Sequence, residues 1–359
     1  MIDAPLTTTD LGLYCAAGDF YVDPWRPVPR AVVTHAHADH ACWGCGRYLT
    51  STAGKGVLQT RMGASAVIDA LDVGVSIDLN GVDVSLYPAG HILGSSQVRI
   101  EHKGHVLVVS GDYKTGPDAT CDPFEPVRCH TFLTESTFGL PIYRWPPQSQ
   151  VFGEINAWWR RNQAEGKASL LLAYALGKSQ RLLSGLDPSI GPIYAHGAVE
   201  KLNRDYRAAG IPLPPTSYVG SVAKGHDWSK ALIVAPPSAY GGPWSRKFGP
   251  LSAGFASGWM MIRGTRRRKA VDRGFVLSDH VDWESLLGAI DATRAESVWV
   301  THGYSAVVVK WLRERGMDAR AIATRYEDEV EEKAEADAEG PGGVEDEPSL
   351  FAPPGDAAP

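Results

Sequence analysis

The stretch "VVTHAHADHACWG" (residues 32–44) places three histidines and one aspartate directly after an apolar run: His35, His37, Asp39 and His40. In a β-strand alternate residues share one face, so the first two histidines point the same way as the strand ends. The turn that follows brings the aspartate and the last histidine toward a neighbouring point. Imidazoles and a carboxylate suit Zn²⁺ and, less specifically, Mn²⁺ or Fe²⁺. Two groups of ligands from one loop therefore predict two ions side by side.

Three further positions offer ligands for such a pair of ions. They are His91 in "PAGHILGSS", Asp112 in "VVSGDYK" and His302 in "VWVTHGY". Each lies beside a glycine near the end of an apolar run, where the backbone turns tightly and exposes the side chain. A lone histidine at a strand end is more often solvated, or satisfied in the core, than a ligand. Together with the first group, the three positions predict a dinuclear metal site.

The chain around these positions changes its pattern twice. Residues 1–142 read as short β-runs joined by Gly-, Pro- and Asp-rich turns, and "HKGH" at residues 102–105 reads as a hairpin turn. An amphipathic helix then begins near residue 148, and strands and helices alternate up to residue 272. That alternation is typical of βαβ units in a parallel sheet. The last part again contains strand, helix, strand and helix.

This pattern predicts an α/β protein in which one domain interrupts another. The core is expected over residues 1–142 and 273–326, with an inserted domain over residues 143–272. Residues 327–359 are acidic, rich in Pro and Gly and poor in apolar positions, so they are expected to be a disordered tail.

The net charge of −6 hides an uneven distribution. Residues 327–359 contain twelve acidic residues and one lysine, a charge of −11, which leaves +5 for residues 1–326. Binding to a polyanion depends on the face that touches phosphate, because counterion release is a local effect. A basic body with an acidic tail is therefore compatible with a nucleic-acid substrate.

Composition favours a cytoplasmic protein. Hydrophobic residues make up 44% of the chain, but no window approaches the roughly 18 uncharged apolar residues of a membrane span. The first residues lack the basic and apolar regions of a secretory signal. The five cysteines are an odd number and widely spread, which favours free thiols in a reducing compartment.

These motifs, in this order, resemble the metallo-β-lactamase superfamily. "TESTFG" (residues 134–139), "LSDH" (277–280) and "VTHG" (300–303), arranged around an insert, resemble the additional motifs of its β-CASP nucleic-acid nucleases. "FYVDPWRPV" and the segment from residue 257 to residue 283 resemble, more narrowly, bacterial DNA ligase-associated exonucleases. The resemblance implies an αββα metallo-β-lactamase sandwich with an inserted parallel α/β domain of the β-CASP type.

The same resemblance implies a role for each ligand. One ion is expected on His35, His37 and His91, and the second on Asp39, His40 and His302. Asp112 is expected to bridge both ions, and Asp23 to orient ligands. A plain turn residue ahead of Pro24 is an equal alternative for Asp23. Zn²⁺ is the expected metal and Mn²⁺ the alternative.

The expected reaction is hydrolysis of a phosphodiester by a hydroxide activated between the two ions. Two adjacent cations lower the pKa of such a water and neutralise charge on the phosphoryl oxygens. The leaving oxygen needs a proton, and the resemblance indicates His280 as the donor, with Glu135 orienting it. Asp39 and Asp112 complete the predicted catalytic set. Without the resemblance, Glu135 reads as an ordinary strand-end carboxylate.

Basic residues indicate the class of substrate. The run "IRGTRRRKAVDRG" (262–274) contains Arg263, Arg266, Arg267 and Arg268, which in an arbitrary protein is most often a solvated surface. Beside a phosphodiesterase site it is interpreted as a backbone clamp. Lys178 and Arg181 begin a predicted helix, where phosphate also binds.

Aromatic residues add a second, weaker indication of nucleic acid. Tyr143 and Trp145 are candidates for stacking bases in a single-strand channel, whereas Trp158 and Trp159 fit core packing on a helix face.

The sequence therefore predicts a metal-dependent DNA repair exonuclease acting on single strands or frayed ends, with an ATP-dependent DNA ligase and a helicase as possible partners. An RNA-processing endo- or exoribonuclease with the same site is the main alternative. A thioester or lactone hydrolase and a non-catalytic scaffold are weaker ones, because of the insert, the arginine run and the intact set of ligands. Cleavage polarity and the physiological metal do not follow from the sequence.

Overall fold

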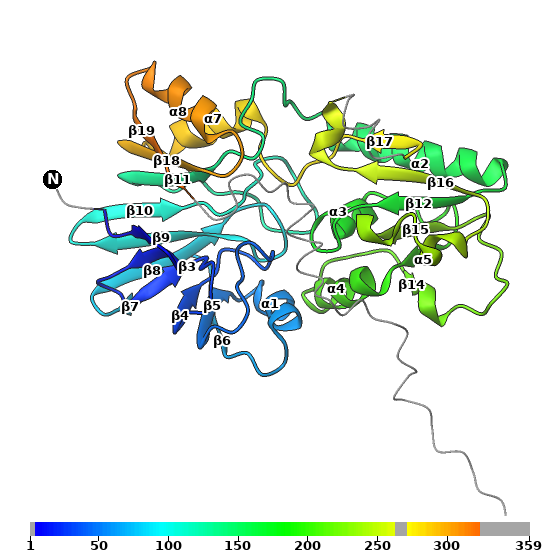
Figure 1. Cartoon of the computed structure of the whole chain (residues 1–359), viewed down its shortest axis with the longest axis horizontal. Coiled ribbons are helices and arrows are strands. Elements are labelled where there is room, and N and C mark those ends of the chain that lie inside the picture. The colour runs from blue at the N-terminus through cyan, green and yellow to red at the C-terminus, as the bar shows by residue number, and fades with distance from the viewer. Residues whose placement is uncertain (1–3, 263–270, 324–359) are drawn as a thin grey trace, which may run out of the picture. The chain divides into compact units, whose positions relative to one another are not determined.

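The computed structural model describes residues 4–262 and 271–323, and Figure 1 shows the order of the elements. The described strands form three sheets. Residues 263–270, which make up most of the predicted arginine run, lie outside the described residues. The predicted acidic tail, residues 327–359, also lies outside them.

The first sheet is built from residues near the N-terminus in simple sequential order. Its strands are β1 (Thr7–Thr9), β2 (Gly12–Cys15), β3 (Phe20–Val22), β4 (Arg30–Val32), β5 (Arg47–Ser51) and β6 (Ile68–Leu71). The first three strands pair antiparallel, and β3 to β6 pair parallel. The quoted histidine stretch therefore leaves a parallel strand, β4, at its carboxyl end.

The second sheet combines strands from residues 76–135 with two strands from residues 297–321. In spatial order its strands are β19 (Asp318–Ala321), β18 (Ser297–Thr301), β11 (Thr131–Glu135), β10 (His105–Val109), β9 (Ser96–His102), β8 (Val82–Pro88) and β7 (Ser76–Leu79). The predicted hairpin is confirmed: His102 pairs with His105, and Lys103 and Gly104 both have positive φ, as a two-residue turn requires.

Apolar side chains from the first two sheets share one core. Phe20 and Val32 of the first sheet cluster with Leu86, Leu107 and Leu133 of the second, so the two sheets pack face to face. Strand β10 alternates, since Leu107 faces this core while its neighbours in the strand face the opposite side. The second sheet is therefore buried on both faces.

Helices cover the outer faces of these two sheets. Trp283 and Ile290 of α7 (Trp283–Thr293) and Leu312 of α8 (Ser305–Arg313) pack against the outer face of the second sheet. Val57 and Leu58 of α1 (Lys55–Met62) pack against the outer face of the first. The order of layers is thus helix, sheet, sheet, helix.

The third sheet is wholly parallel, as the βαβ pattern predicts. In spatial order its strands are β14 (Ser217–Tyr218), β13 (Ile193–Ala195), β15 (Leu232–Ala235), β12 (Ala168–Leu172), β16 (Leu251–Ala256) and β17 (Arg273–Phe275). Strand β17 begins where the predicted insert ends, yet it pairs with β16. The sheet therefore extends to Phe275.

Among the described residues, helices α2 (Gln148–Ala164), α3 (Lys178–Ser184) and α4 (Gly197–Ala208) accompany this sheet, and the short α5 (Pro243–Arg246) follows β15. In α2 the buried residues Val151, Ile155, Trp158 and Trp159 recur at helical spacing and form one apolar face. The predicted core packing of both tryptophans is confirmed.

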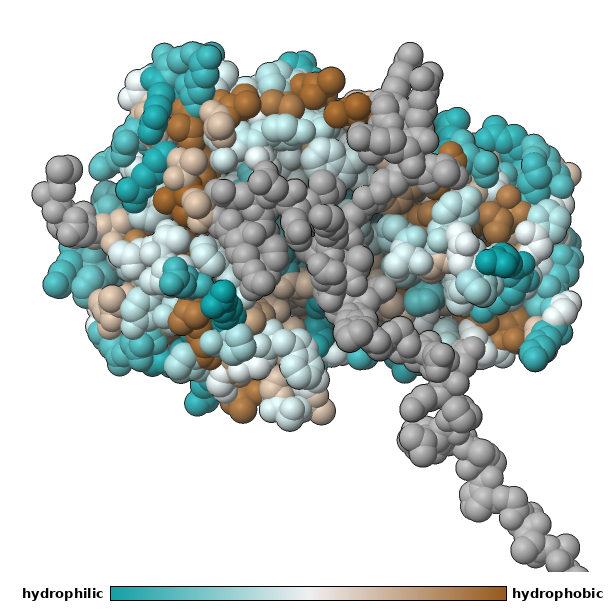
Figure 2. Space-filling model, in the orientation of Figure 1, coloured by the Kyte–Doolittle hydropathy of each residue, from teal (hydrophilic) through white to brown (hydrophobic). Residues whose placement is uncertain are grey.

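The α/β class predicted from the sequence is confirmed by these elements. No helix among the described residues is long and apolar enough to cross a membrane. On the face drawn in Figure 2, apolar residues lie in separate groups between hydrophilic ones.

Candidate metal centre

Many predicted site residues lie beyond the end of a strand, whereas Glu135 is the last residue of β11 and Lys178 and Arg181 lie in α3. His35 follows β4, His91 follows β8, Asp112 follows β10, His280 follows β17 and His302 follows β18. The sheet fixes the position of such a loop, while its side chains are free of the alternation that a strand imposes on their direction. The fold therefore gathers residues from distant parts of the chain in one place.

Two glycines let the backbones approach closely enough. A Cβ atom on Gly111 would lie 2.6 Å from Thr34 Oγ1, and one on Gly177 would lie 2.2 Å from Ile92 Cγ2. Both glycines have positive φ, which other residues adopt only with strain. Gly111 brings Asp112 against the histidine loop, and Gly177 brings the start of α3 to within reach of His37.

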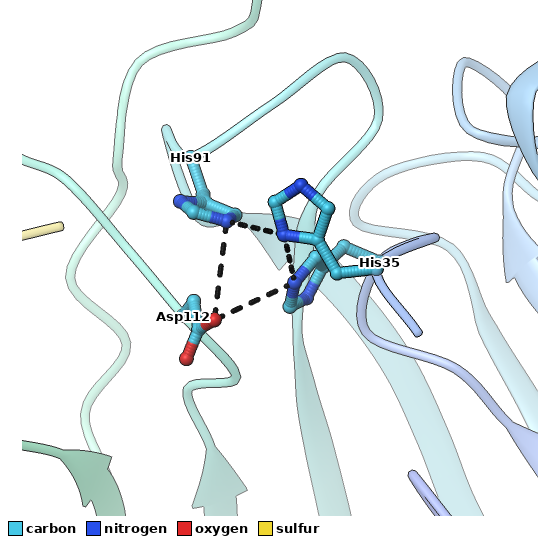
Figure 3. A group of neighbouring side chains, drawn as sticks. His35, His91 and Asp112 are labelled. Carbon is cyan, nitrogen blue, oxygen red and sulfur yellow. Dashed lines mark hydrogen bonds and ion pairs between the residues drawn. The ribbon is translucent and has the colours of Figure 1, made fainter. Parts of the chain in front are cut away.

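Three imidazoles and one carboxylate form the first group of potential ligands. His37 Nδ1 lies 3.1 Å from both His35 Nε2 and His91 Nε2. Asp112 Oδ2 lies 3.6 Å from His35 Nε2 and 3.9 Å from His91 Nε2. In Figure 3 the side chains of His35, His91 and Asp112 point toward one another. All the ligand atoms of this group lie within 4.8 Å of one another.

The far nitrogen of two of these rings is held by a backbone carbonyl. His91 Nδ1 donates to the Asp279 carbonyl at 2.8 Å, and His37 Nε2 donates to the Leu176 carbonyl at 3.2 Å. These bonds fix which nitrogen carries the proton and turn the other nitrogen inward. Both acceptors lie far along the chain from the histidines that they orient.

A second group shares Asp112 with the first. It consists of Asp39, His40 and Asp112. His40 Nε2 lies 3.5 Å from Asp39 Oδ2 and 3.3 Å from Asp112 Oδ2. His40 Nδ1 donates to Asp23 Oδ2 at 2.7 Å, and Asp23 also accepts from the Thr34 amide and hydroxyl. Asp23 therefore orients His40 in the structure, from a backbone position with φ of 45°.

His302 lies beside the second group and not within it. Its ring centroid is 5.6 Å from that of His40, and it lines the same small cavity as Asp39 and His40. Its φ is 57°, an uncommon conformation for histidine. Its role as a ligand stays a prediction.

Burial and charge keep two of the imidazoles neutral. Burial, together with the facing imidazoles of His280 and His37, lowers the pKa of His91 to about 3. Burial and the neighbouring histidines likewise lower the pKa of His35 well below its usual range. Neutral imidazole is the form that binds metal.

The carboxylates act in the opposite sense on the second group. Burial by itself lowers the pKa of His40, but Asp112, Asp39 and Asp23 together raise it well above its usual range. Burial by itself raises the pKa of Asp112, but His40 and His280 lower it well below its usual range. The carboxylates of this group thus attract positive charge to the space around His40.

The donor set fits divalent metal ions. Ligands held at about 2.0–2.1 Å around a tetrahedral Zn²⁺ lie roughly 3.3 Å apart, close to the nitrogen spacings observed. His40 Nε2 is buried and makes no hydrogen bond in the described part of the chain, as expected of an atom reserved for a cation. We call these six residues the metal cluster: His35, His37, Asp39, His40, His91 and Asp112.

His280 and Glu135 form a buried pair next to the metal cluster. His280 Nδ1 lies 2.9 and 3.0 Å from the two carboxylate oxygens of Glu135. Glu135 also accepts from the Tyr113 amide at 2.8 Å, which holds the carboxylate in place. His280 Nδ1 lies 4.0 Å from Asp112 Oδ2. A histidine oriented in this way has the geometry of a general acid or base.

The predicted phosphate ligands Lys178 and Arg181 lie inside the protein. Their exposed fractions are only 2% and 6%, and both pair with Asp279. Of the predicted stacking residues, Tyr143 is fully buried, so its prediction is wrong: the ring packs against Phe138 in place of facing solvent. The predicted phosphate contacts of Arg263, Arg266, Arg267 and Arg268 lie outside the described residues.

Sequence reasoning missed three charged residues near the site. Lys114 and Asp118 follow Asp112 in the same loop, and Asp279 stands inside the quoted "LSDH". Together with Lys178 and Arg181 they form a set that we call the ion cluster: Lys114, Asp118, Lys178, Arg181 and Asp279. For Lys114 and Asp279 the available signal was a charged residue one or two positions from a predicted site residue, whereas Asp118, six positions from Asp112, had no such signal.

Comparison with known proteins gives relatives but no family model that matches the chain. A protein of Opitutus terrae named "Probable DNA ligase" is 32% identical over 314 residues, which cover 87% of this chain and 30% of that protein. The endoribonuclease YSH1 of Saccharomyces cerevisiae is 28% identical over 122 residues, covering 33% of this chain and 15% of the yeast protein. Endoribonuclease ysh-1 of Neurospora crassa is 27% identical over 51% of this chain and 22% of its own length.

The resemblance to the metallo-β-lactamase/β-CASP nucleases is confirmed. The chain spans less than a third of the length of each of these relatives. A solved structure from Enterococcus faecalis V583, described as a protein of unknown function, shares the fold with a TM-score of 0.54 at 12% identity. The structural match covers 84% of this chain and 80% of the Enterococcus chain.

Proposed function

We propose that the chain is a metal-dependent nuclease that hydrolyses phosphodiester bonds of DNA, as a DNA repair exonuclease. The observation that carries the proposal is Asp112, whose carboxylate belongs to both groups of the metal cluster and also faces His280. A shared carboxylate beside an oriented histidine is an arrangement suited to hydrolysis with two metal ions.

The proposal includes the architecture. The first two sheets and their covering helices form the metallo-β-lactamase αββα sandwich, and the third sheet belongs to a β-CASP-type insert. The proposed domains are residues 1–142 and 273–326 for the core, 143–272 for the insert and 327–359 for the tail. The layers of the described elements and the wholly parallel third sheet support this division, except that β17 pairs with the third sheet and lies beyond residue 272.

The residues of the chain have distinct tasks in this reaction. When bound, two divalent ions, Zn²⁺ or Mn²⁺, supply Lewis acidity that lowers the pKa of water and neutralises phosphoryl charge. His35, His37 and His91 would hold one ion, and Asp39 and His40, with His302, the other. Glu135 accepts the Nδ1 proton of His280 and stabilises the ring when both nitrogens are protonated, and in that form His280 can give its Nε2 proton to a leaving oxygen.

Space for a substrate lies next to His280. A cavity of about 480 Å³ is lined by His280, Trp145 and Ser149, among others, and Lys114 and Arg181 also border it. The Trp145 ring donates from Nε1 to the His280 carbonyl, so an aromatic face stands beside the proposed acid. Aromatic side chains beside a phosphodiesterase site suit stacked bases of a single strand.

The relatives support a nucleic-acid substrate and leave two candidates. The region matching the Opitutus protein lies within a chain named as a DNA ligase, which supports DNA and a role beside ligation. An ATP-dependent DNA ligase and a helicase remain the proposed partners. The endoribonuclease relatives favour RNA processing as the second candidate. A cytoplasmic location stays a prediction from the sequence.

The test is a cleavage assay with the purified full chain. Matched single-stranded DNA and RNA, labelled at either end, are incubated with Zn²⁺, Mn²⁺ or a chelator. We expect metal-dependent shortening of DNA, absent with the chelator. Faster cleavage of RNA would establish the second candidate. Failure of metal-loaded protein to cleave either polymer, with turnover of thioester or lactone substrates, would contradict the proposal.

A further inference from the structure

The two cations at the start of α3 are bound by acceptors close to the metal cluster. Arg181 Nη1 donates to the Ser278 carbonyl at 2.5 Å and to Asp279 Oδ1 at 3.0 Å. Lys178 Nζ lies 3.6 Å from Asp279 Oδ2. Arg181 therefore holds both the backbone and the side chain of one short segment, residues 278–279.

That segment carries two contacts of the site. The Asp279 carbonyl accepts the Nδ1 proton of His91, and the next residue along the chain is His280, paired with Glu135. A shift of the segment would move the His91 ring and the proposed acid together. Arg181 touches neither histidine, yet it determines where the acceptor of one and the backbone of the other lie.

Lys114 of the ion cluster, paired with Asp118, contacts the backbone next to His91 from the loop that follows Asp112. Lys114 Nζ donates to the Gly90 carbonyl at 2.6 Å and lies 3.0 Å from Asp118 Oδ2. Asp118 Oδ2 in turn lies 3.4 Å from Arg181 Nε. Lys114 thus holds the backbone of Gly90, just before His91, and Arg181 holds the backbone of Ser278, next to the residue that accepts from the His91 ring.

In this arrangement the guanidinium of Arg181 is held mainly by protein acceptors, although it also lines the cavity beside His280. Its Nε and Nη2 also face Gln148 Oε1, at 3.3 and 3.2 Å. With an exposed fraction of 6%, the side chain is enclosed by protein acceptors. A planar fork with five donors directs them at acceptors that lie on several sides, a geometry that the compact ammonium of a lysine does not reproduce.

We propose that Arg181 is a positioning residue, which sets the His91 ring and the His280 segment through Ser278 and Asp279. This positioning role takes the place of the direct phosphate contact that the sequence predicted for Arg181. Its effect on cleavage rests on the proposed function, but its effect on the His91 side of the metal cluster does not. Loss of partners that orient a ligating histidine typically weakens metal binding about 10–100-fold.

The test compares Arg181→Met and Arg181→Lys with a matched control, Arg160→Gln. Arg160 also lies on a helix of the third sheet and is paired with a carboxylate, Asp187, but its side chain is 56% exposed. Each full-length variant is titrated with Co²⁺, whose visible spectrum reports the ligands around it. Circular dichroism on heating reports folding, and DNA binding is measured at several salt concentrations.

We expect Co²⁺ affinity to fall about 10–100-fold in Arg181→Met and less in Arg181→Lys, with an altered spectrum in both. The salt slope of DNA binding should not change, whereas loss of a phosphate contact would reduce it by about one. Unchanged Co²⁺ binding in a folded variant, or a reduced salt slope, overturns the proposal. If Arg181→Met does not fold, Arg181→Lys decides, because it keeps the charge and loses the fork.

The outcomes separate this inference from the proposed function. A wild-type chain that binds Co²⁺ but cleaves no nucleic acid contradicts only the nuclease function, since the Co²⁺ titration still tests Arg181. Normal cleavage and normal Co²⁺ binding in both Arg181 variants contradict only the positioning role. A wild-type chain that binds no divalent ion contradicts both.

Discussion

The metal cluster and the ion cluster are both buried, but they are completed in different ways. In the ion cluster each carboxylate faces cations of the chain itself: Asp118 faces Lys114 and Arg181, and Asp279 faces Lys178 and Arg181. In the metal cluster imidazole nitrogens face one another at 3.1 Å.

This difference indicates which of the two clusters requires cations that the chain itself does not supply. Buried polar groups are costly unless they are paired, and breaking a buried pair is costlier than never forming one. The ion cluster satisfies this condition with its own residues. The metal cluster keeps a buried nitrogen of His40 without a hydrogen bond among the described residues. It therefore has the chemistry of a site that is completed by cations.

The largest effect is expected when the metal cluster loses Asp112, the carboxylate that its two groups share. Asp112→Asn should lower kcat/KM for DNA at least about 1000-fold, because metal ions supply several kcal/mol of transition-state stabilisation. Elemental analysis should show lost metal, while circular dichroism shows a retained fold. Asp19→Asn, at an exposed carboxylate paired with Arg30, is the control and should cleave normally. Normal turnover by Asp112→Asn would refute a shared ligand.

A second change separates the proposed acid from the metal cluster. His280→Ala should lower kcat by about 10²–10⁴-fold, the usual contribution of general acid–base catalysis. We expect metal content to stay unchanged, because Glu135 holds Nδ1 of His280, although His280, Glu135 and Asp112 also lie close enough together to be potential ligands. Glu135→Gln should act in the same direction by releasing the ring. Loss of metal in His280→Ala would make this histidine a ligand.

A third experiment sharpens the comparison through stability. Metal at about 100 times its Kd should raise the free energy of unfolding by about 2.7 kcal/mol, since it binds only the folded chain. Denaturant titrations with and without a chelator measure this. Asp112→Asn should abolish the gain. An equal gain in Asp112→Asn would place the ion elsewhere.

The smallest expected effect concerns the ion cluster and pH. Burial by itself raises the pKa of Asp279, but Lys178 and Arg181 lower it below its usual range. The folded pKa thus lies below the unfolded value of about 3.9, so the stabilisation is present above that pH and is lost as pH falls through the folded pKa.

Denaturant titrations of metal-free protein between about pH 3 and about pH 6 measure the beginning of this loss, which sets in as pH falls below the unfolded pKa. Asp279→Asn should lose less stability on acidification than the wild type. Asp291→Asn, which removes an exposed carboxylate, is the control and should follow the wild type. Identical acid profiles for all three proteins would show that Asp279 contributes no linked stability.

Much of the fold followed from local patterns. The period of two in β10 and the helical spacing in α2 each report which face is buried, so strand, helix and parallel sheet were predictable. The ligand types were predictable from the dense group of histidines and an aspartate, but the expected shared strand face was not found, because β4 ends at Val32 and His35 and His37 lie in the loop after it. The burial of Lys178, Arg181 and Tyr143 was not, since a charged or aromatic residue looks alike in sequence whether it faces solvent or a partner.

The sequence by itself determined the chemistry: imidazoles and carboxylates in one short loop, and strands whose ends carry more of them. Only the tertiary structure decided how they are oriented, because the acceptor that orients His91 is Asp279, 188 residues away in the chain. Spacing along a chain records what neighbours share, whereas contacts between distant segments depend on how sheets and loops pack. Arg181 is the clearest case, since its partners at residues 278 and 279 turn a predicted surface cation into a buried one.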